Sequence, residues 1–289
     1  MVSLSLILAT CGRRYEVCQF IESLLQSTDV SLTEVELIVV DQNDLDFGLR
    51  EDVCKYSDRL NIKYIHSHVK GLSLSRNIGL KVAEGRYVGF PDDDCLYYPD
   101  TVASVLLQFE NHKCDYLIGR IFDKKNNVNL LKPWPSSSKY LSKWNFYFLS
   151  SSITMFFKNS DLDYFDENLG LGASFGSCED PDYIYRKILS GDVGLYNVNV
   201  NVWHPDLPDH RYNLARVTSY SRGFGYFCRK NISAPIVMIM CGSILKRLVT
   251  TIFARDENKF PALTGYFKGL YQGFNGVVQY PPHHPTGRY

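Results

Sequence analysis

Residues 71–94 read GLSLSRNIGLKVAEGRYVGFPDDD, and this stretch decides the fold. It begins as a predicted helix that ends at Gly85, continues as the apolar strand RYVGF (86–90) and finishes in three consecutive aspartates (92–94). A helix that runs straight into an apolar strand is typical of an α/β protein. Neighbouring carboxylates repel one another, so the three aspartates need either a solvated turn or a positive partner.

The same alternation of strand and helix extends outward from this stretch. Apolar strand-type runs lie at 2–10, 35–41 and 61–67. Apolar residues at helical spacing predict helices within 13–27 and 98–112. Alternation up to about residue 112 predicts a mostly parallel sheet flanked by helices, a Rossmann-like α/β fold. In such sheets the functional groups lie at the carboxyl ends of the strands.

The second half of the chain breaks this regular order. Strands are predicted at 151–158 and 193–203, with a helix at 179–191 between them. The tail from about residue 212 is predicted to be helical. Its most apolar stretch, residues 234–245, is followed by two cations, and we expect it to be too short to cross a bilayer.

The net charge of the 289 residues is zero, but the charge is unevenly placed. Residues 211–289 hold 11 lysines and arginines against two acids, a balance of +9, and residues 1–210 carry the opposite balance of −9. This asymmetry indicates an anionic partner for the tail, namely a membrane, a phosphate-bearing substrate or a nucleic acid.

The eight cysteines contain no C-x-x-C pair and no zinc-like spacing. Scattered cysteines in a chain of this size are typical of a reduced, cytoplasmic protein. The first residues, MVSLSLILAT, lack a cationic start and a cleavage site, so we expect a first strand and not a signal peptide.

The aspartate triplet is a candidate metal site. In D-x-D the outer side chains of an extended segment project the same way, which predicts that Asp92 and Asp94 share a site and that Asp93 points elsewhere. Mg²⁺ or Mn²⁺ suits such oxygen ligands and usually shares them with substrate phosphates. His204, at the end of a strand, is a candidate third ligand, although a lone histidine is more often structural. A solvated acidic turn is the alternative.

A second acidic cluster opens the helix predicted at 179–191. Glu179, Asp180 and Asp182 fall in its first turn, where the helix dipole stabilises negative charge. Simple capping would explain them, whereas an ionised general base at the mouth of a cleft is the functional interpretation. Arg76, early on another helix, could pair with a phosphate, with an ordinary surface arginine as the alternative.

Taken in order, these pieces resemble a family 2 glycosyltransferase with the GT-A fold over residues 3–205. LILATCGR (6–13) resembles the opening strand of the family, with Thr10 and Arg13 retained although the residues around them differ. IVVDQND (38–44) resembles the second strand, whose final aspartate is here Asp41.

Three further segments carry the resemblance. Residues 71–94 match the central G-x-x-x-x-R-N-x-G segment and the D-x-D. EDPDYIYR (179–186) resembles the E-D motif, and VWHP (202–205) resembles the downstream histidine that completes metal binding in part of the family.

The resemblance implies an inverting, metal-dependent transfer of a sugar from a nucleotide-sugar donor, UDP-linked by expectation, to a glycan or lipid-linked oligosaccharide. It implies Mn²⁺ or Mg²⁺ as cofactor, Asp180 as catalytic base, Glu179 at the acceptor and a role in bacterial surface polysaccharide synthesis. Asp94 is the direct metal ligand, helped by Asp92 and His204. The implied nucleotide-sugar contacts are Thr10, Arg13, Asp41, Arg76, Asp92 and Asp93.

The resemblance also divides the chain. It implies a catalytic domain at 1–210, with a nucleotide-sugar half (1–112) and an acceptor half (113–210), and a basic helical extension at 211–289. The extension either lies on an anionic membrane, or packs on the catalytic domain, or mediates a homodimer.

Two alternatives remain from the sequence. A sugar-phosphate nucleotidyltransferase usually has a glycine-rich loop after the first strand, and ATCGRR has one glycine there. A non-catalytic protein that binds carbohydrate or nucleic acid would not need the acidic clusters, because buried carboxylates are costly, so we expect no nucleic-acid partner.

Overall fold

The computed structural model describes residues 1–205 and 213–276. The chain divides into two compact units. Unit 1 comprises Met1–Phe165 and Tyr183–Leu207, and unit 2 comprises Asp166–Asp182 and Pro208–Tyr289. The segment Asp166–Asp182 thus belongs to unit 2, although the sequence-based division placed it in the catalytic domain.

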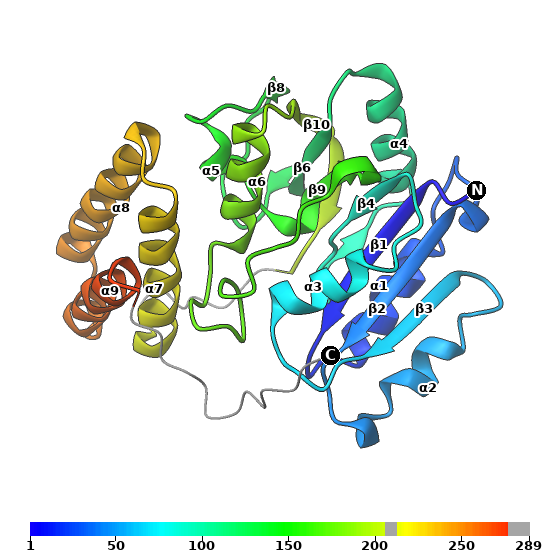
Figure 1. Cartoon of the computed structure of the whole chain (residues 1–289), viewed down its shortest axis with the longest axis horizontal. Coiled ribbons are helices and arrows are strands. Elements are labelled where there is room, and N and C mark those ends of the chain that lie inside the picture. The colour runs from blue at the N-terminus through cyan, green and yellow to red at the C-terminus, as the bar shows by residue number, and fades with distance from the viewer. Residues whose placement is uncertain (206–212, 277–289) are drawn as a thin grey trace. The chain divides into compact units, whose positions relative to one another are not determined.

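Unit 1 is built on one sheet with the strand order β3-β2-β1-β4-β9-β6-β10-β5, with β7 beside β6 and β8 beside β10. Figure 1 shows β3, β2, β1 and β4 side by side in this unit. The strands are β1 (Leu4–Thr10), β2 (Val35–Asp41), β3 (Asn61–His66), β4 (Tyr87–Gly89), β5 (Leu96–Tyr97), β6 (Tyr116–Asp123), β7 (Val128–Asn129), β8 (Lys139–Tyr140), β9 (Met155–Lys158) and β10 (Gly194–Trp203).

The first four strands of this order are parallel, as the alternation predicts. β1 pairs with β2 in register from Leu4 and Val35 to Thr10 and Asp41, and β1 also pairs in parallel with β4. β9 is antiparallel to both β4 and β6, and β6 is parallel to β10. Because two reversals cancel, β4 and β10 run the same way, and their carboxyl ends lie at the same edge of the sheet as those of β1 and β2.

The helices of unit 1 follow the predicted alternation. They are α1 (Tyr15–Leu24), α2 (Leu49–Cys54), α3 (Leu72–Leu80), α4 (Thr101–Asn111), α5 (Phe146–Leu149) and most of α6 (Glu179–Leu189). α3 ends at Leu80 and not at Gly85 as predicted. A Cβ on Gly79 would lie 2.3 Å from Ile7 Cγ2, so the glycine lets α3 lie directly on β1.

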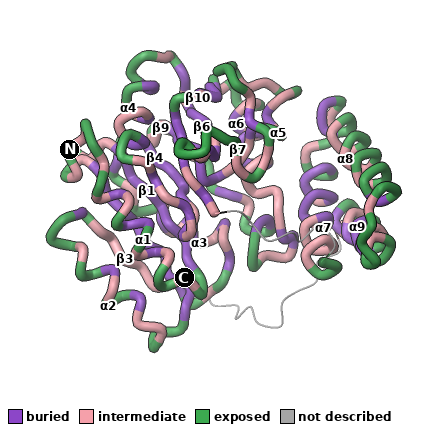
Figure 2. The backbone as a smooth tube through the Cα atoms, turned by 180° about the vertical axis from the view of Figure 1, so that it is seen from behind, coloured by how far each residue is buried: buried purple, intermediate pink, exposed green. Residues whose placement is uncertain are grey.

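The core of unit 1 lies around the central strands. Every residue of β1 and β2 is buried, which explains why both strands appear as nearly continuous apolar runs in the sequence. Figure 2 shows β1 among the buried, purple segments of this unit.

Unit 2 contains α7 (Leu214–Lys230), α8 (Ala234–Phe253) and α9 (Lys259–Phe274). α7 and α9 pack closely because α9 presents Gly265, Gly269 and Gly273, one every four residues, to α7. A Cβ on Gly269 would lie 2.3 Å from the carbonyl oxygen of Thr218. Glycine removes the side chains that would otherwise hold the two backbones apart.

α8 corrects one sequence-based expectation. The apolar helix spans 20 residues, with a mean hydropathy of 1.8 over its best 18-residue window, and by length and composition alone it is long enough to cross a membrane. The prediction that this stretch is too short was therefore wrong, because the helix continues for two turns beyond Lys246 and Arg247.

The segment Asp166–Asp182 is fixed to the helices of unit 2 by ring stacking and charge. The rings of Phe175 and Tyr226 stack with their centroids 4.0 Å apart. Lys230 Nζ lies 2.7 Å from an oxygen of Asp166 and 3.0 Å from an oxygen of Asp182. These contacts explain why this stretch belongs to unit 2.

Candidate active site

Polar side chains follow four strands at one edge of the sheet. Thr10 ends β1 and Asp41 ends β2, the aspartate triplet 92–94 follows β4, and His204 follows β10. All four strands run in the same direction, so these groups meet at their common carboxyl edge. This is the edge at which open α/β sheets bind ligands.

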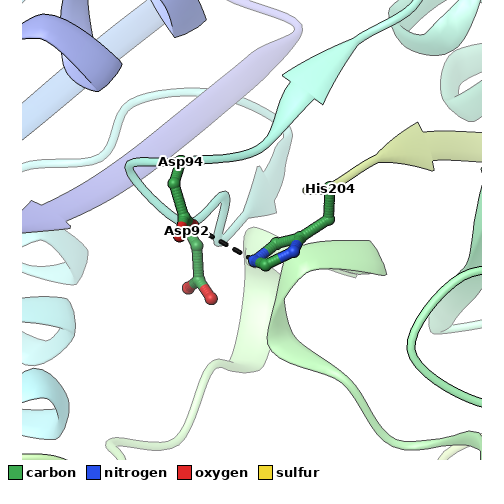
Figure 3. A group of neighbouring side chains, drawn as sticks. All are labelled: Asp92, Asp94 and His204. Atoms are coloured by element: carbon green, nitrogen blue, oxygen red, sulfur yellow. Dashed lines mark ion pairs between the residues drawn. The ribbon is translucent and has the colours of Figure 1, made fainter. Parts of the chain in front are cut away.

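Asp92, Asp94 and His204 form a group whose ligand atoms all lie within 4.8 Å of one another. Figure 3 shows the imidazole of His204 pointing from the end of its strand toward the loop that carries the two aspartates. His204 Nε2 lies 3.2 Å from Asp94 Oδ1. Asp93 and Asp94 lie in a turn and not in the extended segment assumed from the sequence, but the two outer carboxylates still face a common point.

Arg13 and Thr10 bind the other carboxylate oxygens of the triplet. The Thr10 hydroxyl donates to Asp93 Oδ2 at 2.7 Å. Arg13 Nη1 donates to Asp93 Oδ1 at 2.7 Å and lies 2.5 Å from Asp94 Oδ2. One guanidinium thus holds two neighbouring carboxylates, which reduces the repulsion between them. Thr10 and Arg13 were both predicted to lie at the site, but their bonds to the aspartate triplet were not predicted.

Arg76 is not a surface residue. Its side chain is 1% exposed, and Nη2 lies 3.2 Å from Asp92 Oδ1. The guanidinium carbon is 5.4 Å from the ring centroid of Phe165. The surface alternative is therefore excluded, and the structure places this cation beside the first carboxylate of the D-x-D.

The environment separates the pKa values of the neighbouring carboxyls. Burial raises the pKa of Asp93 despite the bonds from Thr10 and Arg13. Burial also acts to raise the pKa of Asp94, but the hydrogen bond and charge of His204 and the charge of Arg13 outweigh it, so this pKa lies below its usual value. Burial acts to lower the pKa of His204, and the bond to Asp94 raises it above its usual value.

Asp41 lies 2% exposed at the end of β2, beside a small cavity. Its Oδ1 accepts hydrogen bonds from the backbone N–H and the side-chain amide of Asn43, at 2.9 Å and 2.6 Å. Its Oδ2 accepts a hydrogen bond from the Tyr64 hydroxyl. The cavity has a volume of about 120 Å³, and its polar lining includes Arg50 and His66 besides Asp41 and Tyr64.

The sequence analysis missed the residues that surround Asp41. Tyr64 and His66 alternate along β3, and the neighbouring β2 runs parallel to it with Asp41 opposite His66. The alternation of polar side chains toward the end of β3 was the sequence feature that could have predicted these neighbours of Asp41.

Glu179, Asp180 and Asp182 lie in the first turn of α6, as predicted. Asp182 is fully buried and accepts hydrogen bonds from Lys230 Nζ at 3.0 Å and from Asn231 Nδ2 at 2.9 Å. Glu179 and Asp180 are partly exposed. The cluster thus separates into one structural carboxylate and two accessible ones.

The family model of glycosyl transferase family 2 matches residues 5–165, which is more than half of the chain and includes β1, β2, α3 and the aspartate triplet. The chain belongs to glycosyl transferase family 2. The sequence-based assignment is confirmed: the protein is a glycosyltransferase, and both the nucleotidyltransferase and the non-catalytic alternatives are disfavoured.

Curated relatives of this glycosyltransferase include two proteins of teichoic acid and poly(ribitol-phosphate) synthesis. It is 29% identical over 205 residues to the minor teichoic acid biosynthesis protein GgaB of Bacillus subtilis, covering 63% of this chain and 22% of the relative. It is 31% identical over 120 residues to the poly(ribitol-phosphate) β-N-acetylglucosaminyltransferase TarS of Staphylococcus aureus, covering 41% and 21%. The matches therefore span about a fifth of each relative.

Solved structures confirm the fold. The crystal structure of S. aureus TarS 1–349 in complex with UDP-GlcNAc has a TM-score of 0.60 at 16% identity and covers 98% of both chains. The mannosyltransferase PcManGT from Pyrobaculum calidifontis in complex with GDP-Man and Mn²⁺ has a TM-score of 0.61 at 15% identity and covers 96% of this chain and 76% of the neighbour. Identities this low show the fold alone, and they confirm the predicted GT-A architecture.

Proposed function

We propose that this glycosyltransferase transfers a sugar from a UDP-linked donor to a hydroxyl of a cell-surface polymer, in an inverting and metal-dependent reaction. The observation that carries the proposal is the convergence of Asp92, Asp94 and His204 at the carboxyl edge of the sheet, within a family 2 chain.

The charges at this edge suit a divalent cation. Three carboxylates meet the guanidiniums of Arg13 and Arg76, which leaves a negative balance of one while His204 is neutral. Two carboxylates and an imidazole form a ligand set that suits Mn²⁺, whereas Mg²⁺ prefers oxygen ligands alone. Asp94, Asp92 and His204 would hold the ion, and a bound ion supplies Lewis-acid stabilisation of the leaving diphosphate.

The residues around the triplet would bind the donor. The cavity beside Asp41 is small, which favours the single ring of uracil over a purine. The carboxylate of Asp41 can accept a hydrogen bond from the N–H of the base, and Tyr64 and Asn43 fix its orientation. Thr10 and Arg13 orient Asp93 through their hydrogen bonds, and these three residues would line the donor site together with Arg76 and Asp92.

Asp180 would act as the base and Glu179 would bind the acceptor. Asp180 removes the proton from the acceptor hydroxyl, and the oxygen forms its bond to the anomeric carbon as the bond to the nucleoside diphosphate breaks on the opposite face. A single displacement inverts the anomeric centre and needs no carboxylate nucleophile. The position in the first turn of α6 supports this role, because the helix dipole favours the ionised carboxylate.

A glycan or lipid-linked oligosaccharide belongs to the proposal as acceptor, and the names of GgaB and TarS favour a phosphate-bearing polymer of the cell surface. A groove of about 670 Å³ between α7 and α9 supports a negatively charged acceptor. It is lined by the cations Arg222 and Lys268 and by the hydroxyl-bearing Thr218, Ser219 and Thr264. We place the reaction in the cytoplasm, in keeping with cysteines that form no disulfide in the described residues.

The test is donor turnover with the full chain. Release of the nucleoside diphosphate, UDP or GDP, from a panel of UDP- and GDP-sugars is measured with Mn²⁺, with Mg²⁺ and with EDTA, first without an acceptor and then with a polyol-phosphate oligomer. We expect release from one UDP-sugar with metal, loss of activity in EDTA, and an inverted anomeric configuration of the product in NMR spectra. Turnover that is unaffected by EDTA, or retention of configuration, would contradict the proposal.

A further inference from the structure

α8 exposes apolar side chains on its outer side. Met238 is 64% exposed, Leu245 62% and Ile252 68%, and these residues recur at intervals of seven along one face of the helix. Val237, Val249 and Phe253 are also exposed. Figure 2 shows the long run of exposed, green backbone along α8. Contiguous apolar surface of this kind marks an interaction site and not a face in contact with water.

Polar groups lie on the inner side of the same helix. Ser243 and Arg247 face α9, where the Ser243 hydroxyl lies 3.0 Å from the Tyr266 hydroxyl and the Arg247 guanidinium carbon lies 5.9 Å from the Tyr266 ring centroid. Thr251, one turn further, is 2% exposed and donates to the carbonyl of Arg247. A helix that packs on a soluble domain buries its apolar face. In α8 the buried residues are only Pro235, Ile236 and Thr251, so most of its apolar side chains are not used for packing.

We propose that the outer face of α8 binds an anionic membrane, with the helix lying in the plane of the interface. Only 17% of the apolar window is buried, so the residues that the structure describes leave most of this face uncovered. Burial of apolar surface in the acyl region contributes about 25 cal/mol per Å². An apolar helix in the interfacial plane is a known mode of binding to a bilayer.

The charges favour a membrane over a second copy of the chain. Lys246 and Arg255 are exposed on and just after α8, and residues 211–289 carry the +9 balance. In a symmetric dimer the same cations would face each other across the interface. Anionic headgroups instead attract each nearby lysine or arginine.

α8 lies in the interface and does not span the bilayer. A spanning helix would place Lys246 and Arg247 well inside the hydrocarbon region, where a charged side chain is strongly disfavoured. It would also break the contacts of Ser243 and Arg247 with Tyr266 on α9. An in-plane helix keeps these contacts and lets the Lys246 side chain reach the headgroups.

The experiment is flotation of the full chain with phosphatidylcholine vesicles that contain or lack phosphatidylglycerol. We expect binding to the anionic vesicles that weakens as salt rises. Leu245→Glu with Ile252→Glu should reduce the partition coefficient about tenfold or more. The matched control is Leu107→Glu with Leu189→Glu, which places the same charges at apolar sites of unit 1 that are about half exposed and should bind like the wild type.

Two measurements keep the outcome clear. Release of UDP from the donor should be equal in all three proteins, which shows that the α8 variant is folded. Wild-type protein that ignores anionic vesicles, or an α8 variant that binds as well as the wild type, overturns the proposal. A wild-type dimer that the α8 variant converts to a monomer, with no vesicle binding, would show that a second copy covers the face.

A fluorophore on Cys241, which is exposed on α8, reports the depth of the helix. In a chain with Cys11→Ser and Cys54→Ser, we expect quenching by shallow lipid quenchers. Quenching at the bilayer centre would show that the helix spans the membrane and would overturn the in-plane arrangement.

Discussion

His204 Nε2 lies 3.2 Å from Asp94 Oδ1, although the two residues belong to distant parts of the sequence. β5 begins two residues after Asp94 and pairs antiparallel with the end of β10, where Leu96 lies opposite Trp203, the residue before His204. The pairing of β5 with β10 therefore brings the histidine to the aspartate triplet.

Asp94→Asn should abolish sugar transfer and weaken Mn²⁺ binding while the melting temperature changes little. The amide keeps the size of the side chain, and Arg13 retains its bond to Asp93, but a neutral oxygen is a poor ligand for a divalent cation. Calorimetric titration with Mn²⁺ and UDP release measure the two effects. Glu110→Gln, at an exposed position of α4, is the control. Wild-type turnover with unchanged metal dependence in Asp94→Asn would exclude this residue as the ligand.

Asp180→Asn should lower kcat by about 10²–10⁴ while the donor binds with unchanged affinity, because the variant lacks the base and keeps the nucleotide site. Single-turnover kinetics and UDP titration separate the two quantities. Glu179→Gln is the matched comparison and should raise the KM of the acceptor instead. If kcat survives in Asp180→Asn and falls in Glu179→Gln, the two roles are exchanged.

Asp182→Asn should lower the melting temperature without changing kcat for the folded enzyme. The buried carboxylate accepts bonds from Lys230 and Asn231. The substitution removes the ion pair with Lys230 and buries an amide whose N–H groups lack these acceptors, at a cost of about 1–3 kcal/mol. Thermal unfolding and active-site titration measure stability and kcat separately. A loss of kcat with an unchanged melting temperature would mean that Asp182 acts in the reaction.

Glu36 should make the stability of unit 1 depend on pH in the acid range. Burial acts to raise the pKa of this carboxyl, but hydrogen bonds from Lys63, Ser5 and the backbone N–H of Glu84 outweigh it and lower the pKa below the usual value. A lowered folded-state pKa gives stability that is present above the unfolded pKa of about 4.3 and is lost as pH falls through the folded pKa.

The measurement compares the wild type with Glu36→Gln between pH 7 and pH 3. We expect the melting temperature of the wild type to exceed that of the variant at pH 7 and the difference to shrink as pH falls. If the difference in melting temperature between the two proteins is the same at pH 7 and at pH 3, the lowered pKa of Glu36 does not contribute to stability.

Gly269→Ala should destabilise the packing of α7 against α9 by about 1–3 kcal/mol, because the added methyl would overlap the Thr218 carbonyl. Gly242→Ala on α8 is the control, since nothing lies within 4 Å of its Cβ position. There alanine should stabilise the helix by about 0.5–1 kcal/mol. Hydrogen exchange of the α7 and α9 amides measures both variants. Equal effects of the two substitutions would show that the glycines are not needed for close packing.

The sequence alone determined the parallel half of the sheet and the candidate ligands. β2 begins and ends at the predicted residues, Val35 and Asp41, because a strand buried on both faces is apolar along most of its length. Asp92 and Asp94 were identifiable because the motif that carries them is contiguous. β6 (Tyr116–Asp123) was not predicted, since a short apolar run does not distinguish a strand from a helix.

The tertiary structure alone decided the contacts between distant segments. Local periodicity does not encode that Arg13 binds both Asp93 and Asp94, that Arg76 is buried beside Asp92, or that Tyr64 donates to Asp41. The sequence also showed that α8 is apolar, but it did not show which face of the helix the described residues leave uncovered. The physical reason is the same in each case: side-chain period fixes which residues share a face of one element, whereas strand pairing and helix packing fix which faces meet.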